Sequence, residues 1–437
     1  MDNQLHAGSA EVVITPPLGV SMAGYYEDRR ADDVLDDLYA KALVISTKET
    51  IAALVVCDLI GLERAITSRL REMIEVRTQI PAAHVMICCT HTHTGPMTSA
   101  WPSTGMYPDE AYMDVLVHKI ADAVQLAFQR RRSASARVAH GRVEGIAFNR
   151  RYWMKDGTLR TNPSFQNPDV GRPAGPIDPD LGLFLLRDDC GAPLALVSNY
   201  AIHPDQVGGT AVCADHEGVV SSIIKQVLGA RCSVLCPNGC CGDINHYDLS
   251  KPLEGQSGFA TAQRSGRALA GEAIRRLSDG QPVQAGLLRA GSRTFQARLR
   301  VPSSEEVAWA EKKAQEEVRA FDAHGLEVVK AHRILEIHAS AVSHVPVEIS
   351  AIAVGDVAFV GLPGEIFVEL GLGIKQQSPF AHTFVAELCN DAAGYVPTRR
   401  AYDEGGYEVA STLFEPGTGE QMVEAAFELL DDLRSGI

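Results

Sequence analysis

Two histidines separated by a single residue, His91 and His93, follow an apolar run that ends at Cys89. In an extended segment, side chains two positions apart lie on the same face, so both rings can converge on one centre. His-x-His is a common zinc-binding pair, although two histidines that merely close a strand are the simpler alternative. The Gly95-Pro96 dipeptide that follows them favours the ligand interpretation. Further ligands would have to come from other parts of the chain.

Two more apolar runs lead to residues of types that commonly bind metals. The run from Ala195 to Ile202 leads to His203, and the run from Ala351 to Val360 leads through a turn to Glu365. Open α/β sheets place their sites at the carboxyl ends of strands, so both residues are candidates for additional ligands. Glu365 is also compatible with a helix N-terminus, where the helix dipole favours a carboxylate. We therefore predict a metal site at which three strand ends meet.

A glycine-rich loop after the short apolar run from Cys232 to Cys236 carries Asp243. The cysteines of this loop do not form the two short pairs that structural zinc usually needs. We expect the loop to turn tightly and to bring Asp243 towards the cleft. Asp58 at a strand end and Asp215 before a helix are candidates to orient the ligating histidines.

Apolar runs of strand length alternate with helical patterns through most of the chain, which is typical of an α/β fold with mixed sheets flanked by helices. Strands are predicted at 51–60, 84–89, 194–200, 232–236 and 351–362, strand pairing at 283–302, and helices at 62–78, 110–129, 218–228, 304–321 and 420–433. Prolines accumulate between about 145 and 180, which predicts a long loop. We expect residues 1–437 to form one unit, divisible into lobes of about 1–280 and 281–437.

The chain has 437 residues with 40 Lys and Arg against 55 Asp and Glu, so its net charge is −15. This acidic balance argues against a nucleic-acid or anionic-membrane surface, because both favour basic patches. The N-terminus lacks a leader pattern and no long uncharged apolar stretch occurs, which favours a cytoplasmic protein that acts on a small molecule. Ten cysteines, some in adjacent pairs, suit reduced buried thiols. A homo-oligomer is compatible with these features.

Further short motifs occur in order along nearly the whole chain. They are Ile14 to Gly19 with Met22 to Tyr25, Asp37 to Val44, Thr90 to Pro96, Phe148 to Arg150, Asn199 to Pro204, Gly242 to Asn245, Leu362 to Glu365, Gly394 to Thr398 and Tyr407 to Leu413. Together they resemble the neutral/alkaline ceramidase family, zinc amidohydrolases that cleave an N-acyl bond.

The resemblance implies particular roles for individual side chains. It implies Zn²⁺ bound by His91, His203, Glu365 and Tyr395, with His93, Arg150 and Tyr407 facing the substrate. A neutral phenol is a poor ligand unless the metal lowers its pKa, so the residues alone do not point to Tyr395. A surface arginine is the alternative interpretation of Arg150.

The chain departs from the family pattern in two places. Where the Gly-Asp loop of ceramidases continues with a Ser and a Pro-Asn, this chain has Asn245, His246 and Tyr247. The chain also ends soon after the helix predicted at 420–433, so we expect the ceramidase catalytic-domain fold without the C-terminal β-sandwich of that family. A substrate smaller than a lipid fits these differences.

These observations predict a zinc-dependent hydrolase that cleaves the amide bond of a small soluble N-acyl compound with metal-activated water. His93, or His246 linked to Asp243, would give a proton to the leaving group, and Arg150 would bind a polar group of the substrate. A lactonase or esterase on the same site stays open as an alternative, as does a non-catalytic binding protein that retains the fold. Retention of every ligand that the resemblance implies argues against the binding protein.

Overall fold

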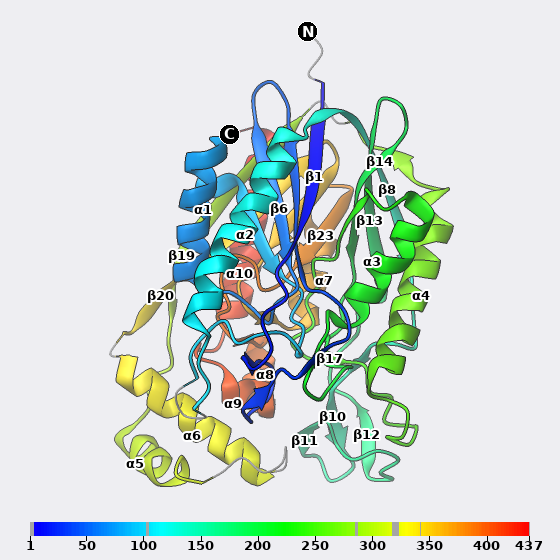
Figure 1. Ribbon diagram of the computed structural model, residues 1–437. Coiled ribbons are helices and arrows are strands. Elements are labelled where there is room, and N and C mark those ends of the chain that lie inside the picture. The colour runs from blue at the N-terminus through cyan, green and yellow to red at the C-terminus, as the bar shows by residue number, and fades with distance from the viewer. Residues whose placement is uncertain (1–3, 102–104, 285–286, 317–322, 341, 437) are drawn as a thin grey trace.

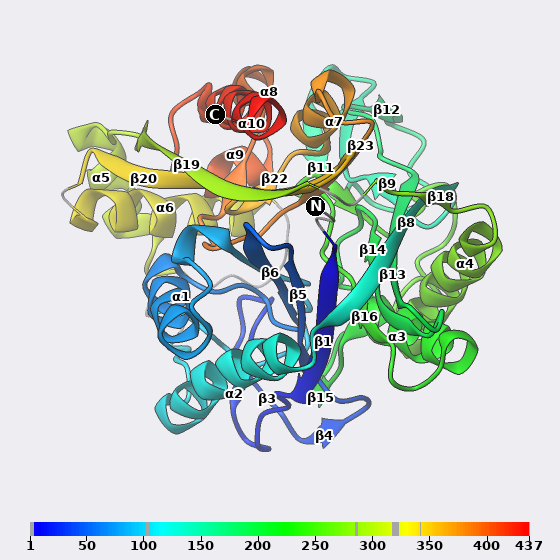
Figure 2. The same cartoon turned by 90° about the horizontal axis from the view of Figure 1, so that it is seen from above.

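Two β-sheets pack face to face, and helices cover the outer face of each, so the chain forms four layers (Figure 2). The computed structural model describes residues 4–101, 105–284, 287–316, 323–340 and 342–436. This arrangement confirms the prediction of an α/β fold with mixed sheets flanked by helices. The division into two lobes near residue 280 stays a prediction.

Nine strands of the described residues form the larger sheet. In spatial order they are β16 (Ser233–Leu235), β14 (Pro193–Asn199), β13 (Asp180–Asp188), β8 (Arg132–Arg142), β1 (His6–Val13), β5 (Tyr39–Ser46), β6 (Ile51–Cys57) and β7 (Val85–Cys89), while β18 (Gln281–Pro282) pairs with β8. Most neighbours run antiparallel, but β7 is parallel to β6 and β16 is parallel to β14. The strands predicted at 51–60, 84–89, 194–200 and 232–236 are β6, β7, β14 and β16, with bounds that differ by up to three residues.

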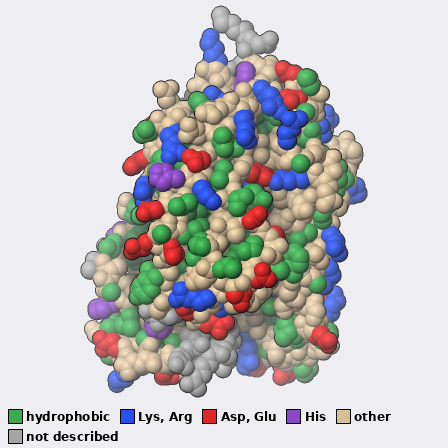
Figure 3. Space-filling view, in the orientation of Figure 1, with side chains coloured by type: hydrophobic (Ala, Val, Ile, Leu, Met, Phe, Trp, Pro, Cys, Tyr) green, Lys and Arg blue, Asp and Glu red, His purple; other side chains and the backbone are tan. Residues whose placement is uncertain are grey.

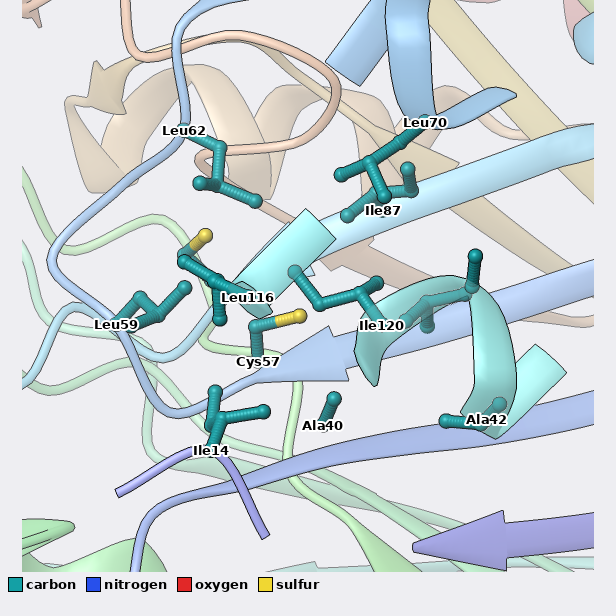
Figure 4. Close-up of a cluster of buried hydrophobic side chains, with 14 of the residues drawn as sticks. Ile14, Ala40, Ala42, Cys57, Leu59, Leu62, Leu70, Ile87, Leu116 and Ile120 are labelled. Atoms are coloured by element: carbon teal, nitrogen blue, oxygen red, sulfur yellow. The ribbon is translucent and has the colours of Figure 1, made fainter. Parts of the chain in front are cut away.

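Four helices cover the outer face of this sheet. They are α1 (Arg64–Thr78) and α2 (Glu110–Gln129) over β5 to β7, and α3 (Asp215–Leu228) and α4 (Phe259–Leu277) over the other half (Figure 2). On α2, Leu116 and Ile120 lie one turn apart and are buried, so one stripe of the helix faces the sheet. Figure 4 shows the cluster that they form around Cys57 and Leu59. Each large aliphatic side chain buried there stabilises the fold by about 1.5–3 kcal/mol, and the packing holds β6 and β7 in place.

The smaller sheet lies on the inner face of the larger one. It consists of β19 (Leu288–Arg298), β20 (His344–Val354), β21 (Val357–Gly361) and β23 (His382–Ala386), and α7 (Val368–Gln377) and α10 (Thr418–Ser435) pack on its outer face. Strands β19 and β20 pair over 11 residues each, which confirms the strand pairing predicted at 283–302. The helix predicted at 420–433 is α10.

The prediction of a single strand at 351–362 was wrong. The chain turns at Gly355 and Asp356, so β20 and β21 form an antiparallel hairpin in which Val354 faces Val357. Gly355 has φ +57°, which a two-residue hairpin turn requires and glycine adopts readily. Both strands are buried, so the apolar run continues through the turn and conceals it.

The long loop predicted at 145–180 was also wrong. This segment contains β9 (Phe148–Asn149), β10 (Arg151–Met154), β11 (Leu159–Thr161) and β12 (Val170–Pro173), and the last three form a small antiparallel sheet at the lower end of Figure 1. Strand β9 pairs with β17 (Ile244–Asn245). Strands of two to four residues are too short to show periodicity, so only their prolines and glycines were visible in the sequence.

The remaining described elements are short or peripheral. They are β2 (Ser21–Met22), β3 (Arg29–Arg30), β4 (Asp33–Val34), β15 (Ala211–Val212), β22 (Glu365–Ile366), β24 (Tyr395–Val396), α5 (Ser304–Lys313), α6 (Ala323–Ser340), α8 (Arg399–Glu404), α9 (Tyr407–Ser411) and a 3₁₀ turn at Ala82–His84. The helix predicted at 304–321 ends earlier, with α5, and residues 317–321 of that prediction lie outside the described residues. The helix predicted at 218–228 begins three residues earlier, at Asp215.

No helix among the described residues is long and apolar enough to cross a membrane. Figure 3 shows acidic and basic side chains interspersed over the visible face. The ten cysteines are free thiols, and all but Cys190 are buried.

Candidate metal centre

His91 reaches the site because the chain turns sharply after β7. The backbone N–H of His91 donates to the carbonyl of Leu59, and its φ angle is +76°. Left-handed backbone is uncommon for residues other than glycine, and it costs about 1–3 kcal/mol. Such strain is most often found at functional sites, where the surrounding structure enforces it.

His91 and His203 face each other across the site with their Nε2 atoms 3.1 Å apart. The Nδ1 atom of His91 lies 2.7 Å from the carbonyl oxygen of Ile60, and that of His203 lies 3.4 Å from the carbonyl oxygen of Cys241. A carbonyl can only accept, so in both rings Nδ1 carries the proton and Nε2 presents a lone pair. When both rings are neutral, the two lone pairs therefore point at each other with no proton between them.

Glu365 adds a third acceptor to this pair. Its Oε2 atom lies 3.4 Å from Nε2 of His91 and 3.9 Å from Nε2 of His203. This oxygen is buried and has no hydrogen-bond partner within the described part of the chain. Burial alone would raise the pKa of Glu365, but the two histidine rings outweigh it and lower the pKa to about 2. Two imidazole nitrogens and a carboxylate oxygen that converge in this way are a ligand set that fits a divalent metal such as zinc.

His93 belongs to the same group, since the ring nitrogens of His91, His93 and His203 lie within 4.8 Å of one another. Both nitrogens of His93 are buried and lack a hydrogen-bond partner among the described residues. Burial lowers the pKa of His93 to about 4, so this ring is neutral at pH 7. The ring packs against Gly24, where a Cβ atom would lie 2.6 Å from the Cβ and Cγ atoms of His93.

Tyr395 approaches the site through a short parallel bridge. Strands β22 and β24 pair Glu365 with Tyr395 directly, which places the phenol beside the carboxylate. Burial and the Glu365 charge raise the pKa of Tyr395 well above its usual range, so the phenol is protonated in this environment. The same short pairing delivers two of the predicted ligands together.

Arg150 is buried, which excludes the interpretation as a surface arginine. Its Nε atom donates to Oε1 of Glu408 at 2.8 Å, and Nη2 donates to the carbonyl of Gly242 at 2.7 Å. Glu408 is fully buried, so the pair neutralises both charges inside the protein. The guanidinium lies 5.3 Å from the centre of the Tyr395 ring and 5.8 Å from that of Tyr407.

A cavity of about 190 Å³ opens beside these side chains. Five predicted site residues line it, namely His93, Arg150, His203, Tyr395 and Tyr407. The other lining residues are Gly24, Tyr25, Thr161, Asn162, Asp205 and Tyr247. Sequence reasoning missed Thr161, Asn162 and Asp205, because the first two lie in the segment taken for a loop and Asp205 follows the proline that ends a strand motif.

The sequence of this chain is similar to that of a known family. A sequence model of the family described as neutral/alkaline non-lysosomal ceramidase, N-terminal, matches residues 6–235, which is more than half of the chain. The chain belongs to this ceramidase family. A search of curated proteins found no significant match.

Two solved ceramidase structures share the fold. The neutral ceramidase from Pseudomonas aeruginosa superposes with a TM-score of 0.77 at 17% sequence identity, and the match covers 100% of this chain and 75% of that one. A structure described as ceramidase complexed with C2 gives a TM-score of 0.78 at 17% identity, with 100% and 76% coverage. At this identity the similarity establishes the fold.

Asp243 of the ceramidase-family loop does not line the cavity. Its carboxylate accepts hydrogen bonds from Nδ2 of Asn149 at 2.7 Å and from the backbone N–H of Val368, the first residue of α7, at 2.8 Å. Burial raises the pKa of Asp243 to about 6. The predicted link between Asp243 and His246 was wrong, because His246 pairs through Nδ1 with Asp205 instead, at 2.9 Å. The loop turns tightly as expected, but it directs Asp243 to the start of α7.

The predicted orienting roles of Asp58 and Asp215 were wrong as well. Asp58 lies 3.5 Å from the buried ammonium of Lys41, and Asp215 accepts from the backbone N–H of Val207 at 2.9 Å. Backbone carbonyls orient the two facing histidines, and a carbonyl cannot be recognised from residue type. Asp215, His216 and Glu217 form a second buried group of metal-binding side chain types at the start of α3.

Asn245 and Tyr247, two of the three residues that depart from the family loop, reach the edge of the cavity. Nδ2 of Asn245 donates to Oδ1 of the cavity residue Asn162 at 2.6 Å, and Tyr247 lines the cavity directly. The departures therefore alter one wall of the ceramidase-family site and leave the proposed ligands in place.

Proposed function

We propose that this protein is a zinc-dependent amidohydrolase that cleaves the N-acyl bond of a small polar molecule. One observation carries the proposal: Nε2 of His91, Nε2 of His203 and Oε2 of Glu365 converge on one buried point, and no Lys or Arg of the described residues pairs with them. Three converging acceptors repel one another unless a cation joins them. His91, His203 and Glu365 would hold the metal, and the protonated phenol of Tyr395, the fourth residue that the resemblance implies, would lie beside it.

When bound, the metal supplies a Lewis acid that polarises a carbonyl and lowers the pKa of water. The Tyr395 phenol, which burial keeps protonated, can donate a hydrogen bond to the carbonyl oxygen of the substrate as negative charge develops there. A well-placed donor of this kind contributes roughly 3 to 4 kcal/mol to the stabilisation of a transition state. Binding the metal through Tyr395 instead would require loss of this proton.

His93 is suited to move the proton that amide cleavage requires. Burial keeps the ring neutral at pH 7, so one nitrogen has a lone pair and the other carries a proton. Because neither nitrogen is engaged by a described residue, the ring can accept a proton at one position and return it to the leaving nitrogen. Arg150 would hold the substrate, since its two bonds to Glu408 and Gly242 fix the guanidinium at the cavity wall.

The cavity supports a small substrate. Pockets for drug-sized ligands usually measure about 300–1,000 Å³, whereas this cavity measures about 190 Å³. Most of the side chains that line it carry a polar group. A compact polar N-acyl compound fits both properties.

A lactonase or esterase is the second candidate, because Asn245 stands where ceramidases have a serine and changes the environment of the leaving group. The test is an assay of zinc-loaded and chelator-treated protein against N-acyl amino acids, N-acyl amino sugars and sugar lactones. We expect amide hydrolysis that the chelator abolishes and zinc restores. Activity on lactones alone would favour the second candidate, and a protein that binds zinc but turns over no compound would favour a binding role.

A further inference from the structure

One wall of the cavity carries a carboxylate that has no role in the proposed reaction. Asp205 follows His203 by two residues and lines the cavity, with its side chain 19% exposed. Among the described residues, His246 alone makes a hydrogen bond or ion pair with this side chain, through Nδ1 to Oδ1 at 2.9 Å. The second carboxylate oxygen is therefore available to a bound molecule.

The backbone around Asp205 is held from several sides. The carbonyl of Pro204 accepts from the backbone N–H of His93, and the N–H of Val207 donates to Asp215. The carbonyl of Gln206 accepts from the N–H of Gly258. Because the residues before and after Asp205 are fixed in this way, the carboxylate is a prearranged feature of the wall.

His246 is the one described partner of the Asp205 charge at this position. Arg150, the other charged residue of the lining, is neutralised by Glu408. No Lys or Arg among the described residues forms an ion pair with Asp205. Two aromatic residues, Tyr25 and Tyr247, line the same cavity. Arg29 lies 4.3 Å from the centre of the Tyr25 ring, and the His246 ring centre lies 4.0 Å from that of Tyr247, so an organic cation in the cavity would contact the other face of each ring.

We propose that Asp205 binds a protonated amine on the leaving half of the substrate, so that the preferred substrates are N-acylated diamines. A carboxylate beside aromatic rings recognises an ammonium group through charge and through the ring faces. His246 acts as a positioning residue, because its N–H fixes one carboxylate oxygen and leaves the other to the ligand. This inference rests on the proposed amidase function for the reaction but not for the binding of the amine.

The experiment compares three N-acetyl compounds of equal length whose far end carries an ammonium, a hydroxyl or a carboxylate group. For the wild type we expect kcat/KM to be highest for the ammonium compound and lowest for the carboxylate compound. Asp205→Asn should lower kcat/KM for the ammonium compound by about 10- to 100-fold, the range expected for loss of a charge-assisted contact, and change that for the hydroxyl compound far less. Equal losses for both compounds, or no preference in the wild type, would overturn the proposal.

A binding measurement separates this inference from the proposed function. Titration calorimetry with free 1,4-diaminobutane should detect binding to the zinc-loaded wild type and to Asp169→Asn, an exposed control, but not to Asp205→Asn. His246→Ala should weaken binding, whereas His246→Asn, which keeps an N–H donor, should restore it. If no N-acyl compound is hydrolysed yet the diamine binds in this Asp205-dependent way, the amidase proposal fails and the amine site stands. If the protein hydrolyses the neutral amide but binds no diamine in an Asp205-dependent way, the amine site fails and the amidase proposal stands.

Discussion

Nε2 of His91 and Nε2 of His203 face each other at 3.1 Å, because a backbone carbonyl takes the Nδ1 proton of each ring. This contact is unfavourable between two lone pairs, and the Glu365 carboxylate adds a third acceptor. A single proton could satisfy one pair of these atoms only. A metal ion would satisfy all three, which supports the proposed metal site.

Replacing either facing histidine should therefore abolish tight metal binding. We expect His91→Ala and His203→Ala each to weaken zinc affinity by more than about 100-fold, since loss of even an outer partner of a metal site costs roughly 10- to 100-fold. Competition with a chromophoric chelator measures the affinity. His118→Ala, on the exposed face of α2, is the matched control and should bind zinc as the wild type does. Full occupancy in the His91→Ala, His203→Ala double variant would rule out the site.

His93→Ala should separate metal binding from turnover. If His93 moves the proton and does not bind the metal, the variant keeps zinc affinity within about threefold and loses roughly 100- to 10,000-fold in kcat, the usual contribution of a general acid or base. Zinc affinity and kcat are measured on the same preparation. Since the ring nitrogens of His93 lie within 4.8 Å of those of the other two histidines, loss of zinc from this variant would identify it as a third imidazole ligand.

Gly24→Ala should displace the His93 ring by direct steric contact. At Gly24 a Cβ atom would lie 2.6 Å from Cβ and Cγ of His93, and φ is +102°. Gly19 has a similar φ of +89° with nothing within 4 Å of its Cβ position, so Gly19→Ala reports the backbone strain alone. We expect both variants to lose about 1–2 kcal/mol of unfolding free energy, but only Gly24→Ala to lower kcat markedly. Urea unfolding and steady-state kinetics measure the two effects, and equal kcat values would show that the His93 ring tolerates displacement.

The strand ends were the part of the site that the sequence could predict. His91, His203 and Glu365 each follow a buried run of residues, which marks them as strand ends. Strands β7 and β14 lie towards opposite edges of the larger sheet and β21 belongs to the smaller one, so the packing of the two sheets and the loops bring the three side chains together. Tyr395 came only from the family resemblance, because its partner Glu365 lies 30 residues away in a pairing of two residues per strand. Among the longer elements, the helix predicted at 110–129 has the bounds of α2, because its apolar stripe is strong and Asp109 caps it.

Tight turns and polar pairings could not be predicted from the sequence. The direction of the loop after Cys236 depends on which backbone N–H groups its side chains reach, and residue types do not reveal this. The sequence therefore predicted Asp243 near the cavity, whereas its carboxylate contacts the start of α7. The pair of Asp205 and His246 joins residues 41 positions apart that no periodicity relates. Side-chain hydrogen bonds across loops fix the positions of these groups, and they leave no pattern along the chain.

Glu408 should be important for stability as well as for the cavity. It is fully buried, pairs with Arg150 at 2.8 Å, lies 3.5 Å from Arg151 and accepts from Thr161 at 3.0 Å. Glu408→Ala would leave buried guanidinium groups without this partner, which we expect to cost about 3–5 kcal/mol of unfolding free energy. Glu144→Ala breaks an ion pair whose two side chains are 62% and 66% exposed, so it should cost less than about 1 kcal/mol. Similar losses in the two variants would contradict the structural role of Glu408.

Asp243 should make stability depend on pH in a definite direction. Burial raises its pKa to about 6, whereas an aspartate in the unfolded chain has a pKa of about 3.9. Between about pH 4 and pH 6 the folded protein therefore retains a proton that the unfolded chain has released. The contribution of this carboxyl to the unfolding free energy is thus largest below pH 4 and declines by roughly 1 to 3 kcal/mol as the pH rises to 6.

Asp243→Asn cannot titrate, so the unfolding free energy of the wild type minus that of the variant should fall over this interval. Urea unfolding at pH 4, 5, 6 and 7 measures the difference, with the exposed Asp169→Asn as control. A difference that is constant or rises with pH would show that Asp243 is ionised in the folded protein throughout, stabilised by its bonds from Asn149 and Val368.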